Sequence, residues 1–274
     1  MGILNFLGIR KNKIGVALGS GGIKGFSHIG VLKVLKQNNI PISYMSGTSA
    51  GALIGGMYLT HDQSIEKLES VSAEIGTKEV INILADFSLN GGFIRGSKAL
   101  DFLNKLLNNA NIEDLPIPFV IVTTNLKTGF PMFIKKGNLA EAIRASSSLP
   151  LIFKPAKIGK HLYIDGGVSM PVPIKPLKEM GANRIIASNM DSELLPLEIL
   201  KNDRVTVNPI ERAFALMVRD MANEDCREAD VTISPNFRSI VDPGNVSNYA
   251  KRKEIITLGE IETLKHIEKI RRLV

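Results

Sequence analysis

The sequence predicts an α/β fold built on a mainly parallel sheet, and three observations indicate it. Two apolar runs, 14–18 (IGVAL) and 42–45 (ISYM), are each followed by a glycine-containing turn and a helical pattern. Strand, loop, helix, strand and helix in this order form a βαβ arrangement, whose strands lie parallel with a right-handed crossover. A third run, 118–126 (PFVIVTTNL), has the length and β-branched content of a buried strand.

The first two helices follow directly from the spacing of apolar residues. His28, Val31, Leu32 and Leu35 recur at i, i+3, i+4 and i+7 with polar residues on the other side, and an Asn-Asn pair and a proline end this helix. The second helix is expected at 50–60 (AGALIGGMYLT), which begins at the turn after the second strand.

The rest of the chain alternates helical patterns with short strands. Residues 62–117 read as mainly helical, with a glycine-punctuated loop at 89–96. Hairpin strands are expected at 129–137 and 153–167, and short helices at 138–147 and 175–180. A further strand follows at 181–190 and a loop at 191–210. Two closing helices, at 211–226 and 254–273, stand on either side of a last strand at 230–235.

Composition excludes several classes of protein. The single cysteine, Cys226, rules out a disulfide framework within the chain and a multi-cysteine zinc site. The net charge of +7 comes from dispersed lysine and arginine residues without interleaved aromatics, so a solvated basic surface is favoured over nucleic-acid binding. No apolar run reaches the roughly 18 residues of a membrane span, and the start is the reverse of a secretory signal. We therefore expect a cytoplasmic protein.

Ser49 is the candidate nucleophile. It lies in GTSAG (47–51), a G-x-S-x-G motif between a predicted strand and a predicted helix. In a nucleophile elbow the serine occupies a strained turn, and glycines two positions to either side let strand and helix approach closely. The helix N-terminus then directs N–H groups toward the reacting centre. A plain turn is the alternative, and the flanking elements favour the nucleophile.

The glycine loop GSGGIKG (19–25) is the candidate oxyanion hole. It fails the dinucleotide pattern because its last glycine falls one residue late and no acidic residue follows about 20 positions on. It also fails the P-loop pattern, since Lys24 is followed by glycine. Backbone N–H groups of Gly21 and Gly22 remain as donors to a developing oxyanion, with Lys24 adding positive charge or orienting the loop.

Asp165 in YIDGG (163–167) is the candidate base. None of the histidines stands in a compelling context: His28 lies on the apolar side of its helix, His61 follows a helix end, His161 is at a hairpin tip, and His266 lies on an exposed helix face. A Ser49–Asp165 dyad is then the economical arrangement, with His28 or His161 as the alternative bases. Burial would raise the pKa of the aspartate and make it a better base.

In order and spacing these three motifs resemble those of the patatin-like phospholipases, especially their bacterial members. The stretch 144–173 (RASSSLPLIFKPAKIGKHLYIDGGVSMPVP) also resembles a segment of that family. The resemblance covers about residues 14–190, so we expect one domain over 1–274 with a C-terminal helical extension at about 191–274. Ser20 departs from the family, since plant-type members have glycine there.

The resemblance implies a three-layer α/β/α sandwich and hydrolysis of lipid acyl esters without calcium or another cofactor. By position, Ser49 would be the nucleophile, Asp165 the base, and Gly21 and Gly22 the oxyanion donors. The other motif residues would support them: Gly19, Lys24, Gly25, Gly47, Gly51 and Gly166.

The sequence thus predicts a serine acyl hydrolase that acts on lipid or ester substrates and makes transient contact with the inner membrane surface. A small-ester or thioester hydrolase and a low-turnover lipid-binding regulatory protein are the alternatives. Residues 62–117 would either form a mobile cap over an acyl groove or simply pack against the body. Head group, acyl position and oligomeric state are not written in the sequence.

Overall fold

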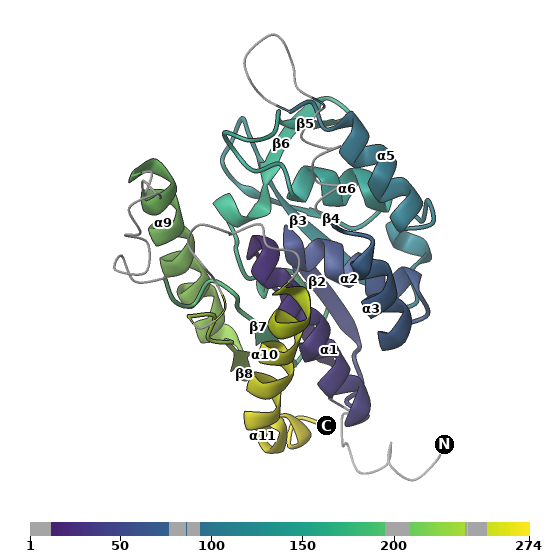
Figure 1. The fold of residues 1–274 in the computed structure, drawn as a ribbon, viewed down its shortest axis with the longest axis vertical. Helices are drawn as coiled ribbons and strands as arrows, with labels where there is room; N and C mark the ends of the chain where they lie inside the picture. The colour runs from purple at the N-terminus through teal and green to yellow at the C-terminus, as the bar shows by residue number, and fades with distance from the viewer. Residues whose placement is uncertain (1–11, 77–85, 87–93, 195–208, 239, 241–250) are drawn as a thin grey trace.

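A sheet of eight strands runs through the middle of the molecule (Figure 1), in a computed structural model that describes residues 12–76, 86, 94–194, 209–238, 240 and 251–274. The strand order is β5-β6-β3-β2-β1-β7-β8, and β4 pairs with β3. The strands are β1 (Ile14–Leu18), β2 (Tyr44–Thr48), β3 (Phe119–Asn125), β4 (Pro131–Ile134), β5 (Ala156–Ile158), β6 (His161–Asp165), β7 (Arg184–Ser188) and β8 (Val231–Ile233).

Five strands form the parallel part of the sheet, in the order β3, β2, β1, β7 and β8. Every residue of β1 and β3 is buried, as near-continuous apolar runs require in a sheet covered on both faces. Since the strands are parallel, their carboxyl ends meet at one edge of the sheet, where ligand sites of open α/β folds are found. The predicted mainly parallel sheet is confirmed.

The antiparallel strands β4 and β6 both pair with β3, and β5 pairs with β6. Val122 of β3 pairs with Thr48 on one side and with β4 on the other, while the next residue, Thr123, pairs with Asp165 and with β4. A strand residue that pairs with two strands has one of them on each edge. Since β4 is the second partner of both Val122 and Thr123, β2 and β6 lie one after the other along the opposite edge of β3. Asp165 therefore enters the sheet just past the end of β2.

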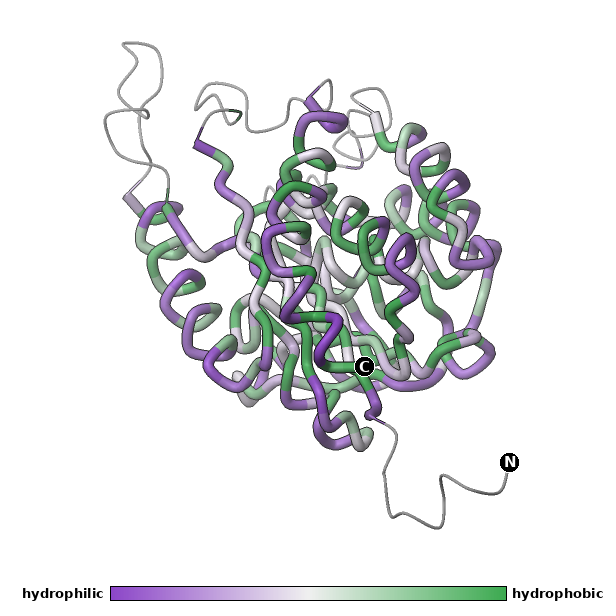
Figure 2. Tube along the Cα trace, turned by 90° about the horizontal axis from the view of Figure 1, so that it is seen from below, coloured by the Kyte–Doolittle hydropathy of each residue, from purple (hydrophilic) through white to green (hydrophobic). Residues whose placement is uncertain are grey.

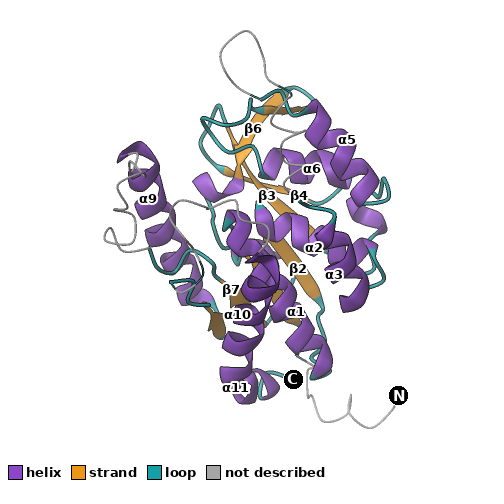
Figure 3. Ribbon diagram, in the orientation of Figure 1, coloured by secondary structure: helices purple, strands orange, loops and turns teal. Residues whose placement is uncertain are grey.

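Helices cover both faces of the sheet, which gives the three layers seen in Figures 1 and 3. One face carries α1 (Ser27–Gln37), α2 (Ala50–Thr60) and α10 (Arg252–Lys265), which share the larger apolar core with Val16 and Leu18. The other face carries α7 (Lys175–Glu179) and α9 (Pro209–Asp225), which pack with Ala17. Figure 2 shows the hydrophobic strands between helices of mixed hydropathy. The predicted α/β/α sandwich is confirmed.

Three other helices follow the predicted pattern with shifted ends: α3 (Ile65–Ala73), α5 (Ser97–Leu106) and α6 (Leu139–Ser146). The closing helix expected at 254–273 is instead divided at His266 into α10 and α11 (Ile267–Arg271). The second strand runs to Thr48 rather than ending at 45, so it leads directly into Ser49. Most of the expected loops at 89–96 and 191–210 lie outside the described residues. Within the described residues, no helix is long and apolar enough to cross a membrane.

Candidate active site

Ser49 occupies a strained turn between β2 and α2. Its φ is 53° and its ψ −118°, a backbone conformation that costs a non-glycine residue free energy and that clusters at functional sites. The neighbouring glycines are required by close packing. A Cβ on Gly51 would lie 2.1 Å from the carbonyl oxygen of Leu18, and one on Gly47 would lie 2.6 Å from Cα of Ala52. The strand–turn–helix context expected for a nucleophile elbow is present.

The hydroxyl of Ser49 donates a hydrogen bond of 2.7 Å to Oδ2 of Asp165, although the two residues lie 116 apart in the chain. The shared edge of β3 brings them together. The other carboxylate oxygen accepts from the backbone N–H of Gly167 at 2.8 Å, which fixes the orientation of the carboxylate. A Cβ on Gly166 would lie 2.2 Å from the carbonyl oxygen of Val122, so only glycine lets the chain turn here.

Burial dominates the electrostatics of Asp165, whose exposed fraction is 4%. Desolvation raises the pKa of this carboxyl to about 6, against the lowering effect of the hydrogen bonds from Ser49 and Gly167, and the charge of Asp191 adds to the increase. The carboxylate is therefore ionised near neutral pH and is a stronger base than an exposed aspartate.

The end of α6 supports the elbow, a contribution that sequence reasoning missed. The N–H of Ser49 donates to Oγ of Ser146 at 2.8 Å, and the Ser146 hydroxyl donates to the carbonyl of Val122 at 2.7 Å. The carbonyl of Ser148 accepts from the N–H of Asp165 at 3.0 Å. Both candidate residues are thus tied to one serine-rich turn, whose sequence (SSS) carries no distinctive signal by itself.

The glycine loop packs against the start of α2. A Cβ on Gly25 would lie 2.4 Å from Cβ of Ala50, the residue after the candidate nucleophile. Gly21 and Gly22 have φ values of 153° and 54°, which favour glycine. Among the described residues, the N–H groups of Gly21 and Gly22 have no hydrogen-bond acceptor. Gly19 donates its N–H to the end of β7 at Ser188, which anchors the loop.

Asp191 holds the glycine loop from the side and was missed because it lies in a predicted loop. Its carboxylate accepts from the hydroxyl of Ser20 at 2.7 Å and pairs with the ammonium of Lys24 at 2.5 Å. Burial opposes its ionisation, but the Lys24 charge and these hydrogen bonds outweigh burial and lower the pKa. The serine that departs from the glycine of plant-type relatives thus has a partner, and Lys24 orients the loop.

The four histidines lie away from the Ser49 hydroxyl or bind other groups. His28 is fully buried, with Nε2 2.9 Å from the carbonyl of Gly19 and Nδ1 2.8 Å from Oγ of Ser188. Burial lowers its pKa to about 4, so the ring is neutral and steadies the loop. His61 and His266 bind within their own helices, and His161 is exposed.

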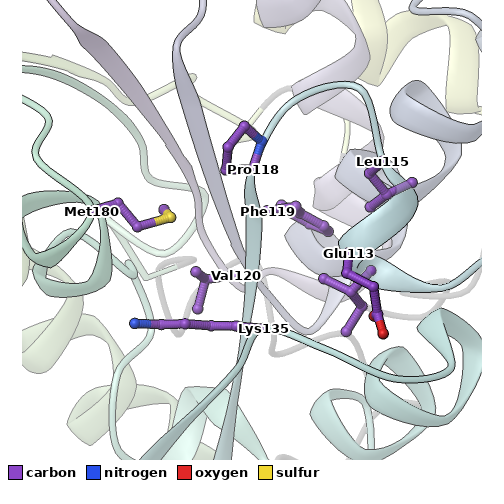
Figure 4. Close-up of a pocket in the computed structure, with 8 residues that line it drawn as sticks. Glu113, Leu115, Pro118, Phe119, Val120, Lys135 and Met180 are labelled. Carbon is purple, nitrogen blue, oxygen red and sulfur yellow. The ribbon is translucent and has the colours of Figure 1, made fainter.

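A hollow of about 240 Å³ lies at the other end of β3 (Figure 4), around Pro118, Phe119, Val120, Lys135 and Met180. It lies near the amino end of β3, whereas Asp165 pairs with Thr123 near the carboxyl end, so it is separate from the candidate site. Within the described residues, no group of three or more His, Cys, Asp or Glu side chains is placed to hold a metal ion.

Comparisons with known proteins identify relatives of this chain. An NTE family protein of Mycobacterium bovis is 30% identical over 188 residues, which are 69% of this chain and 52% of the relative. Lysophospholipase NTE1 of Cryptococcus neoformans is 31% identical over 66% of this chain and 11% of the relative. The chain thus spans about half the length of the mycobacterial relative and a smaller share of the fungal one.

A likeness among solved structures concerns the fold. The crystal structure of VipD from Legionella pneumophila has a TM-score of 0.53 at 15% identity, covering 94% of this chain and 66% of that one. The family model of the patatin-like phospholipases matches residues 16–178, a span that contains the elbow, the glycine loop and Asp165. The chain therefore belongs to the patatin-like phospholipase family.

Proposed function

We propose that the protein is a serine acyl hydrolase that cleaves fatty-acyl esters of lipids with Ser49 as nucleophile and Asp165 as base. The observation that carries the proposal is the 2.7 Å hydrogen bond from a strained elbow serine to a buried carboxylate. Membership of the patatin-like phospholipase family and the lysophospholipase among its relatives favour lipid esters as the substrate class.

The reaction would proceed in two halves. As Oγ of Ser49 attacks the ester carbonyl carbon, Asp165 takes the hydroxyl proton, and the N–H groups of Gly21 and Gly22 bind the negative oxygen. The tetrahedral intermediate expels the alcohol, which receives the proton from Asp165, and an acyl-enzyme remains. A water molecule then attacks the acyl carbon and gives a proton to Asp165; collapse of this second intermediate returns the proton to Ser49 and releases the fatty acid.

The raised pKa of Asp165 suits this role. With a pKa of about 6 the group is mostly ionised at neutral pH, yet it accepts a proton more readily than an aspartate in water. A serine hydroxyl is far less acidic, so proton transfer must accompany attack on the carbonyl. Among the described residues, the N–H groups of Gly21 and Gly22 have no hydrogen-bond acceptor, so they can bind the developing negative charge without reorganisation.

The C-terminal segment supports a single domain over residues 1–274. Strand β8 joins the sheet beside β7, and α10 packs along α1. The larger apolar core therefore draws on both ends of the chain. As part of this proposal, the protein is located in the cytoplasm and makes contact with the inner membrane surface.

Covalent labelling tests the nucleophile directly. A fluorophosphonate probe should label the wild-type protein with one equivalent at Ser49. Ser49→Ala should abolish the label, whereas the control Ser64→Ala, at the half-buried N-cap of α3, should keep it. Hydrolysis of a phospholipid panel and of p-nitrophenyl esters of increasing chain length then defines the substrate. Absence of labelling in a folded wild-type protein that still binds lipid would instead indicate a binding protein, and a preference for short chains a small-ester hydrolase.

A further inference from the structure

Exposed apolar side chains are concentrated in one part of the sequence. Of the twelve exposed large hydrophobic residues in the described part of the chain, six fall between 126 and 162. Phe130 has an exposed fraction of 71% and Leu151 of 63%, and neither is needed to close the core. Soluble proteins seldom gather such residues without a binding role.

Three of these residues lie at one end of the sheet. Leu126 continues β3 beyond its last paired residue, and its N–H donates to the carbonyl of Leu162 at 2.9 Å, so the two lie side by side. Leu162 in turn pairs with Lys157 across β5 and β6. Phe130 stands at the β3–β4 turn. We call Leu126, Phe130 and Leu162, with the lysines Lys127, Lys157 and Lys160, the hairpin surface.

The turn holds Phe130 outward through its own hydrogen bonds. The side-chain oxygen of Asn125 accepts from the N–H groups of Lys127 and Thr128, and the N–H of Asn125 donates to the carbonyl of Phe130 at 3.0 Å. Gly129 supplies the positive φ that the turn needs. The turn is therefore ordered without burying Phe130, so exposure of the ring is a property of a defined structure.

The hairpin surface carries three lysines and no acidic residue, in a basic stretch of the chain. Residues 126–164 contain seven lysine and arginine residues and one glutamate, in a chain whose net charge is +7. Lys127, Lys157 and Lys160 form no ion pair with any described carboxylate. Exposed apolar residues bordered by unpaired lysines match a bilayer with anionic head groups, which takes up apolar side chains at its interface and attracts basic ones.

This surface lies at the same end of the sheet as the candidate site. Asp165 ends the strand that contains Leu162, and the carbonyl of Ser148 accepts the N–H of Asp165. Three residues after Ser148, Leu151 is exposed in the loop that leads to β5, with a φ of 71° that is unusual for leucine. A bilayer in contact with the hairpin surface would therefore lie close to Ser49.

We propose that the protein docks on a bilayer containing anionic lipids through the hairpin surface. The role of docking, which is to bring lipid esters to Ser49, rests on the proposed function. Docking itself does not require that the protein hydrolyse the lipid. The helices α10 and α11 are not part of the surface, although they also carry exposed lysine and leucine residues.

Vesicle sedimentation tests the proposal. The full chain should bind phosphatidylcholine vesicles that contain phosphatidylglycerol, bind pure phosphatidylcholine weakly, and lose binding as salt rises above about 0.1 M. Phe130→Ser should lower the partition coefficient about tenfold. Lys157→Gln with Lys160→Gln should lower it about 25-fold, at about fivefold for each lysine. The matched controls, Leu264→Ser and Lys253→Gln with Lys269→Gln, should bind like the wild type.

Three results would overturn docking through this surface: equal binding to neutral and anionic vesicles, equal losses in the hairpin and control variants, or no vesicle binding at all. A concentration-dependent dimer in light scattering that Phe130→Ser abolishes would assign the surface to a second copy of the chain instead. Probe labelling of Ser49 and hydrolysis of a water-soluble ester should be unchanged in the hairpin variants. If labelling fails while vesicle binding behaves as expected, the proposed function fails and the docking surface stands.

Discussion

Replacement of Asp165 by asparagine should abolish catalysis and yet stabilise the fold. The side chain is buried at 4% exposure and accepts hydrogen bonds from Ser49 and Gly167. An amide of the same shape can accept from Gly167 through Oδ1 and donate to the Ser49 hydroxyl through Nδ2. The substitution therefore removes the charge and the basicity with little change in packing.

The magnitude follows from the pKa of Asp165, which burial raises from an ordinary value of 3.8 to about 6 in the folded protein. The folded state thus binds the proton more tightly than the unfolded chain does. The associated stability is fully present below about pH 4, declines as pH rises, and is lost above about pH 6. A shift of about two units corresponds to about 3 kcal/mol of unfolding free energy. Asp165→Asn carries no such loss, so the variant should gain about 3 kcal/mol over the wild type on passing from about pH 4 to about pH 8.

Urea unfolding of both proteins across this pH range measures the difference, and ester hydrolysis measures catalysis. Hydrolysis should fall by a factor of about 10² to 10⁴, the range typical of a lost general base. Asp225→Asn is the matched control. Burial also raises the pKa of Asp225 to about 6, and this carboxylate accepts from the N–H of Val172 rather than from Ser49. The unfolding free energy of Asp225→Asn should likewise rise relative to the wild type as pH increases, while ester hydrolysis is retained.

Two results would refute this reasoning. A stability difference between Asp165→Asn and the wild type that stays constant from about pH 4 to about pH 8 would show that the pKa of Asp165 does not change on folding. Wild-type ester hydrolysis in Asp165→Asn would show that this carboxylate is not the base, whatever its pKa.

Three further substitutions test the supports of the site. Gly51→Ala should lower the unfolding free energy by at least about 2 kcal/mol in thermal or urea melts, because its Cβ would overlap the Leu18 carbonyl; a wild-type melt would contradict the close approach. Asp191→Asn should lower kcat for a soluble ester about tenfold with little change in KM. It should also move the acid limb of kcat/KM to lower pH, since the Asp191 charge raises the pKa of Asp165; an unmoved limb would exclude this coupling. Ser146→Ala should cost about 1–3 kcal/mol in urea unfolding by leaving the N–H of Ser49 without its acceptor, and an unchanged midpoint would show that the contact is dispensable.

Local pattern was sufficient for most of the secondary structure. Helix and strand periodicity depends on neighbours within a few residues, so α1, α2 and β3 were predictable from spacing alone. Strand ends were less predictable: β2 continues to Thr48, past the apolar run, because pairing with β3 supports Ser46 and Gly47, which have no β preference of their own. His28 was predicted as a core histidine and is fully buried.

The sequence by itself determined the α/β class, the elbow at Ser49 and Asp165 as a candidate base, because each is written in a short stretch whose geometry is local. Only the tertiary structure decided that these two side chains touch, since their contact depends on β6 taking the edge of β3 where β2 ends. It also brought Asp191 to the glycine loop and placed Leu126 beside Leu162. Such contacts join segments far apart in the chain, and no spacing rule within one segment specifies them.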